Sequence, residues 1–230
     1  MVGEKLIIAI DGPAGAGKSA AARLLAARLD LPYVDTGAIY RALALLAVEA
    51  GIPLPPDEAG VRKLVHLAWQ LRIRFGGTTQ EPKVFLGDRE VTSALRSVTI
   101  SKASSIVSAI PEVRAQLLAL QRALGKKGAV VEGRDIGTVV FPEAFIKFFL
   151  TARPEVRAQR RAQELRVSQA NVDFASVLEE IRQRDLRDAT REVCPLRPAA
   201  DAIVIDTSDL RLEEVVQELT KLVLQRQGVR

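Results

Sequence analysis

One stretch near the start of the chain has the residue types and spacing of a phosphate-binding loop. Gly12-Pro13-Ala14-Gly15-Ala16-Gly17-Lys18-Ser19 fits the pattern G-x-x-x-x-G-K-[ST] at every position. Glycines let the backbone turn tightly, so that successive N–H groups can surround an anion beside the positive end of a following helix. We therefore predict that Lys18 reaches the β- and γ-phosphates of a nucleoside triphosphate and that the Ser19 hydroxyl binds its Mg²⁺.

The flanking sequence supplies the elements that such a loop requires. Residues 5–10 are an apolar run that predicts a buried strand, and residues 19–29 are rich in Ala and Leu and predict a helix. A strand, a glycine-rich loop and a helix in this order favour phosphate binding over a chance Gly/Ala loop. The motif predicts a bound triphosphate but does not say what reaction follows.

Arginines are the second feature that points to phosphate chemistry, because a guanidinium holds phosphate oxygens bidentately. A helix from Pro154 would carry one stripe of arginines, and a helix beginning after Asp173 would carry another. The two stripes consist of Arg153, Arg157, Arg160 and Arg161, and of Arg184, Arg187 and Arg191. Like charges at this spacing destabilise a helix by roughly 0.2–0.5 kcal/mol per pair, so the stripes predict a polyanion between them.

Local ion pairing is the alternative explanation of these stripes, since acidic residues are close at hand. Glu155 and Glu164 lie in the first helix, and Asp185 and Asp188 lie in the second. Residues 168–173 join the two helices and could act as a hinge, which would make the pair a lid over bound phosphates.

The composition limits the class of protein. The chain has 230 residues, of which 48% are hydrophobic, so it can bury a core as one domain or as one domain with an insert. It shows no signal peptide and no apolar run long enough to span a membrane. Cys194 is the only cysteine, which excludes an internal disulfide and fits a cytoplasmic setting, and His66 is the only histidine, which excludes a histidine metal cluster.

Short apolar strands alternate with helices along the chain and predict an α/β fold. Strands are expected at 31–34, 129–131, 146–150 and 201–206, and helices at 36–50, 57–70, 92–108, 111–124 and after 208. Thr36, Asp57 and either Ser208 or Asp209 are the expected N-caps. Residues 71–75, 83–86 and 89–91 predict a small antiparallel meander inserted in this pattern.

Five blocks of the sequence together resemble the bacterial cytidylate kinases. They are residues 11–19, 35–41, 132–142, 184–188 and 198–202. The blocks G-R-D-I-G-T-V-V-F-P and R-D-L-R-D are the most discriminating, and the five blocks span almost the whole chain.

The resemblance implies phosphoryl transfer from ATP to CMP or dCMP with Mg²⁺, by a cytoplasmic enzyme whose family precedent favours a monomer. It implies a P-loop NTPase three-layer fold with a five-stranded parallel sheet, an inserted antiparallel subdomain and a short helical lid. The core would comprise residues 1–40, 110–150 and 189–230. The NMP-binding region would comprise residues 41–109, with the antiparallel insert at about 62–91, and the lid region would comprise residues 151–188.

The resemblance also implies the site residues. The ATP-binding loop would be Gly12, Pro13, Ala14, Gly15, Ala16, Gly17, Lys18, Ser19 and Ala20, with Ser19 as the hydroxyl for the metal. The CMP site would comprise Thr36, Tyr40, Arg41, Ser105, Arg114, Arg134, Asp135, Arg184, Asp188 and Arg191. The catalytic cations would be Lys18, Arg134, Arg157, Arg160, Arg161 and Arg191.

The implied roles are chemically coherent. Ser105, Arg114 and Asp135 would meet the cytosine edge, where an acid can accept a hydrogen bond from the N4 amine that uracil lacks. The phosphate of a nucleoside monophosphate is largely ionised at neutral pH, so the acceptor needs no general base. Positioning and fixed positive charge would then carry the reaction.

Three other functions are weighed against this one. A kinase for another small acceptor, such as adenylate or shikimate, would share the loop and the arginines but lacks the two discriminating blocks. A GTPase switch needs an N-K-x-D motif, and the only asparagine, Asn171, is followed by Val172. A basic nucleic-acid-binding protein fits the net charge of +5, but the arginines are dispersed and aromatic residues are few.

Overall fold

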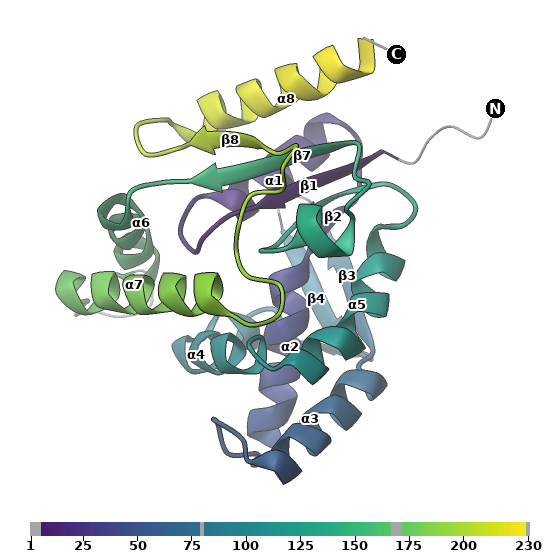
Figure 1. Ribbon diagram of the computed structural model, residues 1–230, viewed down its shortest axis with the longest axis vertical. Coiled ribbons are helices and arrows are strands. Elements are labelled where there is room, and N and C mark those ends of the chain that lie inside the picture. Colours follow the sequence, from purple (N-terminus) through teal and green to yellow (C-terminus); the bar gives the residue numbers. More distant parts are fainter. Residues whose placement is uncertain (1–5, 79–80, 167–171, 229–230) are drawn as a thin grey trace. The chain divides into compact units, whose positions relative to one another are not determined.

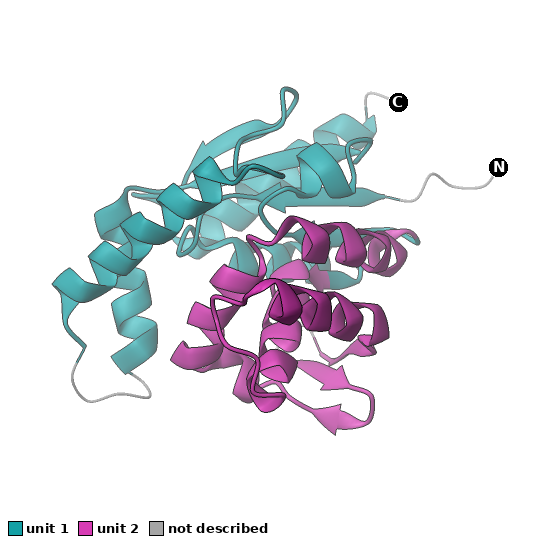
Figure 2. Ribbon diagram, turned by 60° about the horizontal axis from the view of Figure 1, so that its bottom comes forward, with its two compact units in different colours: residues 1–33, 127–230 teal, residues 34–126 magenta. Residues whose placement is uncertain are grey.

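The computed structural model describes residues 6–78, 81–166 and 172–228. The chain forms two compact units, one of residues 1–33 and 127–230 and the other of residues 34–126 (Figure 2). The predicted division into core, NMP-binding region and lid region is a functional one and stays a prediction.

A five-stranded sheet organises the first unit, in the order β2-β6-β1-β7-β8. Its strands are β1 (Ile7–Asp11), β2 (Tyr33–Asp35), β6 (Ala129–Glu132), β7 (Ile146–Thr151) and β8 (Ile203–Asp206). The pairings of β1 with β6, of β1 with β7 and of β7 with β8 are parallel. The predicted α/β fold with a five-stranded parallel sheet is confirmed, and each predicted strand appears within two residues of its expected bounds.

Two helices cover one face of this sheet. They are α1 (Lys18–Arg28) and α8 (Leu212–Gly228), which pack against each other and against β1, β6 and β7 in one apolar core. Ile8, Phe148 and Leu219 are completely buried there, so the strand that leads into the glycine-rich loop is held rigidly. Ligands bind beyond the carboxyl ends of strands in such sheets, and this is where the loop lies.

A pair of helices follows β7. Figure 1 shows β7 running directly into α6 (Pro154–Arg166), with α7 (Phe174–Thr190) lying beside α6. A single turn of π-helix (Ile136–Val140, η2) follows β6, a feature that the sequence analysis did not predict. The predicted hinge at 168–173 lies largely outside the described residues.

The second unit is mainly helical with a small sheet. Its elements are α2 (Thr36–Glu49), α3 (Glu58–Gln70), β3 (Ile73–Gly77), β4 (Pro82–Leu86), β5 (Arg89–Glu90), the 3-10 turn η1 (Ala94–Arg96), α4 (Val98–Val107) and α5 (Pro111–Gly125). The three strands pair in the antiparallel order β3-β4-β5, which confirms the predicted meander. Leu43, Leu64, Val107 and Leu117 are completely buried in the helical core of this unit.

Several local predictions need correction. Asp35, not Thr36, is the N-cap of α2, because its carboxylate accepts from the Ala38 N–H at 3.0 Å. Residues 92–108 are not one helix, since Ser97 ends η1 and caps α4. The last helix begins at Leu212, so neither Ser208 nor Asp209 caps it; their side chains accept hydrogen bonds from Arg153 instead.

No described helix combines the length and the apolar character needed to cross a membrane.

Gly12 lies very close to the backbone of a neighbouring strand. It adopts φ 144°, and a Cβ built on it would lie 1.9 Å from the carbonyl oxygen of Leu150 in β7. We predict that Gly12→Ala lowers the free energy of unfolding by more than about 3 kcal/mol, because the clash is with backbone that cannot move aside. Urea unfolding followed by circular dichroism measures this loss.

Gly51 provides the matched control for Gly12. It also has a positive φ, 64°, but a Cβ there would have no described atom within 4 Å. Gly51→Ala should therefore cost only the about 1–2 kcal/mol of a left-handed conformation. Equal losses for the two variants would show that the close approach to Leu150 is unimportant.

Candidate active site

The glycine-rich loop joins β1 to α1 with the geometry of an anion site. Gly15 and Gly17 adopt φ values of 76° and 84°, which favour glycine. Gly17 is the N-cap of α1, and no side chain caps that helix end. The first N–H groups of α1 therefore remain available to a bound phosphate.

Lys18 is buried in the first turn of α1 and folds back onto the loop. Its Nζ donates to the carbonyl oxygen of Pro13 at 2.7 Å. Burial, and next the charge of Arg134, lower the pKa of Lys18 to about 7, although the nearby Glu132 opposes this change. This environment disfavours the charged form of Lys18, and a phosphate anion bound nearby would stabilise that charge.

Asp11, the last residue of β1, connects the loop strand to the segment after β6. Its carboxylate accepts from the backbone N–H groups of Ile136 at 2.8 Å and Gly137 at 2.7 Å. Burial raises the pKa of Asp11 from 3.8 to about 6, against the opposing effect of these two hydrogen bonds. This interaction fixes the position of the Glu132–Asp135 turn relative to the phosphate-binding loop.

Asp188 is the centre of the predicted acceptor cluster within the first unit. Its carboxylate accepts from Nε of Arg134 at 3.1 Å, and its carbonyl oxygen accepts from Nε of Arg191 at 3.4 Å. Burial disfavours its charge, but Arg134, Arg184 and Arg191 together outweigh burial and hold the pKa of Asp188 below its usual range. The structure thus brings together four of the residues predicted for CMP.

Three of the four arginines of the first stripe form ion pairs, and two of these pairs use acids that the pairing alternative named, Glu164 and Asp185. Arg153 pairs with Asp209 at 2.6 Å and Arg161 with Glu164 at 2.9 Å, while Arg157 forms a bidentate pair with Asp185. Arg160 instead donates to the hydroxyl and the carbonyl oxygen of Thr207 at 3.0 and 2.6 Å. The Thr207 hydroxyl lies 3.1 Å from the carbonyl oxygen of Ala16, which places Arg160 beside the loop.

Of the remaining predicted acceptor residues, Asp135 is buried in the first unit and the other five lie in the second. Arg41 donates to Asp35 at 2.6 Å, and its guanidinium lies over Gly37. Tyr40 is buried with the guanidinium of Arg114 above its ring, 5.3 Å from the centroid. Arg114 also donates to the Ser108 carbonyl oxygen at 3.0 Å.

Two buried polar atoms mark this part of the second unit. The hydroxyl of Ser105 and Oε1 of Gln121 have no hydrogen-bond partner among the described residues. Buried polar atoms are nearly always paired with protein, water or ligand, so these two indicate that a polar group binds near them. This fits the predicted role of Ser105. Thr36 is likewise buried, at the start of α2.

Sequence reasoning missed several residues that the structure places at these sites. Asp11 belongs to a block that carried the resemblance, but it received no role, whereas Asp185 was named as a possible partner of the arginines and does bind Arg157. Gln121 donates to the Tyr40 hydroxyl at 3.4 Å. The sequence pattern that could have identified it is a polar residue on an apolar helix face, four positions after the buried Leu117. Thr207 had no recognisable signal, because its contacts depend on three distant segments.

The described residues contain no group of three or more His, Cys, Asp or Glu side chains that could hold a metal ion. Ser19 is exposed at the start of α1, where a hydroxyl can reach an ion bound to phosphates. This donor set fits Mg²⁺, which keeps several waters and takes few ligands from a protein when it binds with a nucleotide.

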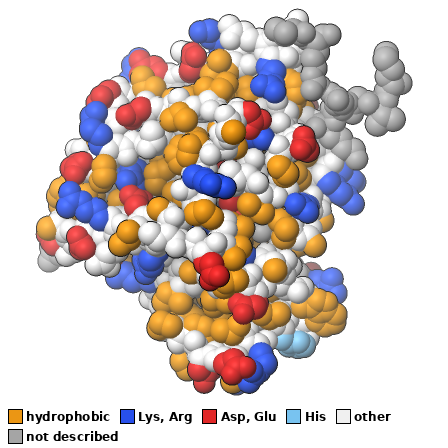
Figure 3. Space-filling view, viewed as in Figure 1, with side chains coloured by type: hydrophobic (Ala, Val, Ile, Leu, Met, Phe, Trp, Pro, Cys, Tyr) orange, Lys and Arg blue, Asp and Glu red, His pale blue; other side chains and the backbone are white. Residues whose placement is uncertain are grey.

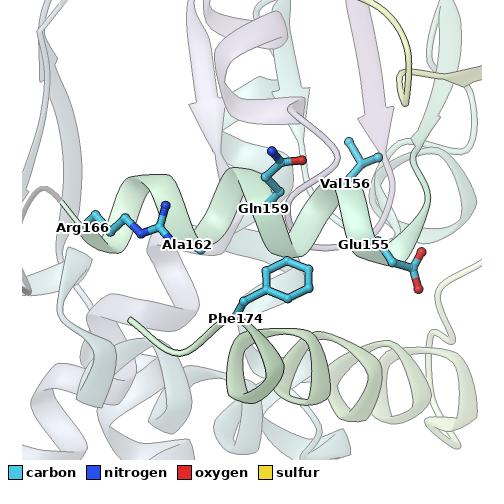
Figure 4. Close-up of a pocket in the computed structure, with 6 residues that line it drawn as sticks. All are labelled: Glu155, Val156, Gln159, Ala162, Arg166 and Phe174. Carbon is cyan, nitrogen blue, oxygen red and sulfur yellow. The ribbon is translucent and has the colours of Figure 1, made fainter. Parts of the chain in front are cut away.

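One face of the molecule and one cavity lie outside these clusters of predicted site residues. On the face shown in Figure 3, Lys and Arg side chains are interspersed with acidic and apolar ones. A cavity of about 400 Å³ lies between α6 and α7 (Figure 4). None of the predicted site residues lines it; its lining consists of Glu155, Val156, Gln159, Ala162, Arg166 and Phe174.

Comparison with known proteins gives a consistent result. A family model described as Cytidylate kinase matches residues 8–225. The cytidylate kinase of Carboxydothermus hydrogenoformans is 47% identical over 223 residues, which cover 96% of this chain and 99% of that protein. The cytidylate kinase of Pelotomaculum thermopropionicum is 50% identical over 212 residues, covering 91% and 92%.

A solved structure of shikimate kinase from Bacteroides thetaiotaomicron is also similar, with a TM-score of 0.47 and 15% identity over 95% of this chain and 98% of that one. That likeness is too slight to bear on substrate or mechanism.

Asp11 gives a pH-dependent prediction. The folded protein holds the Asp11 proton more tightly than the unfolded chain does, so the stabilising effect of this group is present below about pH 4 and is lost as the pH rises through 6. Asp11→Asn removes this titration and leaves one N–H without an acceptor. We expect the variant to be less stable than the wild type, with a deficit that shrinks by roughly 1 kcal/mol from pH 5 to pH 7.

Urea unfolding at several pH values tests this expectation. The exposed Asp88, in the turn after β4, provides the control, and the deficit of Asp88→Asn should stay within about 0.5 kcal/mol over the same range. A constant deficit for Asp11→Asn would mean that Asp11 does not titrate in this range.

Proposed function

Since this chain belongs to the cytidylate kinase family, we propose that it transfers the γ-phosphoryl group of ATP to CMP or dCMP and releases ADP and CDP or dCDP. One observation carries the proposal most directly. The phosphate-binding loop after β1 and the Arg134–Asp188 cluster after β6 belong to the same compact unit, at the carboxyl ends of adjacent parallel strands. A donor loop beside an arginine cluster is the arrangement that phosphoryl transfer requires.

Residues 12–20 form the ATP side of the proposal. The backbone N–H groups of the loop and the start of α1 would bind the phosphates, and Lys18 would leave the Pro13 carbonyl for the β- and γ-phosphoryl oxygens. Ser19 would hold Mg²⁺, which when bound neutralises charge on the phosphates. Arg160, beside Gly17 through its bonds to Thr207, and Arg161 would add positive charge to the transferring group.

The acceptor side of the proposal follows the residues that the resemblance implies. Arg134 and Arg191 would hold the phosphate of CMP, and Arg184 and Asp188 would hold the pentose. Thr36, Tyr40, Arg41, Ser105, Arg114 and Asp135 would complete the CMP site, with the last three at the cytosine edge. The carboxylate of Asp135 is buried after β6, which suits an acceptor for the N4 amine.

This chain's own groups would act by position and charge rather than by proton transfer. The acceptor phosphate is already ionised, so no general base is required. The arginines would orient it in line with the γ-phosphoryl group and stabilise the charge that spreads over the equatorial oxygens.

The proposal extends to the setting of the enzyme. We place it in the cytoplasm as a monomer that acts on nucleotides, without a nucleic-acid or membrane partner. The dispersion of basic residues along the sequence, and on the face shown in Figure 3, supports this choice over a nucleic-acid-binding protein. The division into core, NMP-binding region (41–109) and lid region (151–188) belongs to the same proposal.

An acceptor panel tests the function. ADP formation from Mg·ATP is measured with AMP, CMP, dCMP, GMP, UMP and shikimate, and without an acceptor. We expect CMP and dCMP to be used and UMP to give a kcat/KM at least about a hundredfold lower, because uracil would leave the buried Asp135 carboxylate without its donor. Near-equal kcat/KM for CMP and UMP would refute the assignment of the base-reading residues.

Lys18→Ala tests the donor side. We expect kcat to fall by about 10³-fold, since the charge nearest the transferring group is lost. The fold should be retained, because removing a buried cation that lies beside Arg134 and Arg184 relieves repulsion. Circular dichroism checks the fold, and a variant with the wild-type kcat would contradict the role of the loop.

A further inference from the structure

Arg157 is buried and bound to three separate segments of the first unit. Its side chain is 4% exposed. Nε donates to the carbonyl oxygen of Ala152 at 2.8 Å, and one terminal nitrogen donates to the carbonyl oxygen of Ala14, in the phosphate-binding loop, at 3.1 Å. The same fork forms the bidentate pair with Asp185 of α7, with one N–O distance of 2.9 Å. Four of its five N–H donors thus have partners in the protein.

The loop itself is pressed against this residue. A Cβ on Gly15 would lie 2.9 Å from Cβ of Arg157 and 3.0 Å from its carbonyl oxygen. The start of α6 and the phosphate-binding loop are therefore in direct contact, and Arg157 is the residue through which they meet.

The helix α7 is anchored by two carboxylates one turn apart. Asp185 binds Arg157, which follows β7, and Asp188 binds Arg134, which follows β6. The strand β1, which leads into the loop, lies between β6 and β7 in the sheet. The two ion pairs thus fix α7 on either side of the loop strand. Arg184, proposed for the pentose, immediately precedes Asp185.

The two helices also pack through apolar side chains. Their buried core consists of Ala158, Val177 and Ile181, with Leu165, Val172 and Leu178 packed against it, and the cavity shown in Figure 4 is lined mainly by α6. The other ion pair between these helices, Arg182 with Glu155, is 55% exposed at both side chains. An exposed pair contributes little, whereas a buried bidentate pair restricts orientation strongly.

We propose that Arg157 is a positioning residue that, through Asp185, holds α7 so that Arg184 and Asp188 face the acceptor nucleotide. This inference rests on the proposed function, because it assumes that α7 binds CMP. The resemblance instead matches Arg157, Arg160 and Arg161 to lid arginines and leaves open which of them would contact the transferring phosphoryl group. In the structure, the guanidinium binds the phosphate-binding loop and α7.

The two roles predict different kinetics. If Arg157 positions α7, removing either partner of the ion pair should raise KM for CMP by roughly tenfold and change kcat less than about threefold. If Arg157 binds the transferring group, Arg157→Lys should lower kcat strongly while Asp185→Asn should not. Arg157→Lys keeps the positive charge but loses the fork.

A double-mutant cycle decides between them. We would measure kcat and KM for CMP in the wild type, Arg157→Lys, Asp185→Asn and the double variant. Positioning predicts that the double variant is no worse than either single variant, because all three lack the same link. Glu155→Gln, which breaks the exposed pair between the same two helices, is the matched control and should stay within about twofold of the wild type.

The measurements distinguish a failure of this inference from a failure of the proposed function. A wild type inactive with CMP would overturn the proposed function, and the inference would fall with it. An active wild type with additive effects, or with a kcat loss confined to Arg157→Lys, would overturn the inference alone. Thermal unfolding confirms that each variant is folded, and if Asp185→Asn does not fold, the split between KM and kcat in Arg157→Lys still distinguishes the two roles.

Discussion

The double hydrogen bond from the backbone of Ile136 and Gly137 to the Asp11 carboxylate is the constraint on which the site depends. It joins the end of the central strand, which continues into the phosphate-binding loop, to the segment that carries Arg134 and Asp135. Burying a carboxylate is unfavourable unless its oxygens are satisfied, and here two N–H groups satisfy it. Gly137 allows close packing here, since a Cβ on it would lie 3.4 Å from Oδ2 of Asp11 and 3.0 Å from Cδ of Lys147.

Much of the fold was predictable because its signals are local. The loop motif, the apolar runs of the strands and the Asp57 cap each depend on a few neighbouring residues, and each appears in the structure. The errors occur where local signals compete. Asp35 and Thr36 are both good N-caps, and Asp35, which also binds Arg41, is the one used. The π-turn after β6 depends on the distant Asp11 and so left no local signal.

The residue types that form the site could be predicted from the sequence, but most of their contacts could not. Charged residues could be assigned to phosphate chemistry, but spacing along a helix cannot say which arginines have acids facing them from other elements. Asp185 reaches Arg157 across 28 positions of sequence and Asp209 reaches Arg153 across 56. Pairing of this kind shows that Arg153 and Arg157 hold distant segments together, which their positions along the helix did not indicate.

The charges around Lys18 explain why this site would favour a phosphate ligand. Lys18 is buried beside Arg134 and Arg184, with Glu132 and Asp11 as the opposing charges, and the sum lowers its pKa to about 7. A triphosphate would add negative charge where the site has an excess of positive charge, so binding would restore the full charge of the lysine. Burial is the largest cause of this shift and the charge of Arg134 is the next, so a bound anion would offset both effects. An uncharged ligand would not stabilise the charge of Lys18, so the cluster of cations favours anionic ligands.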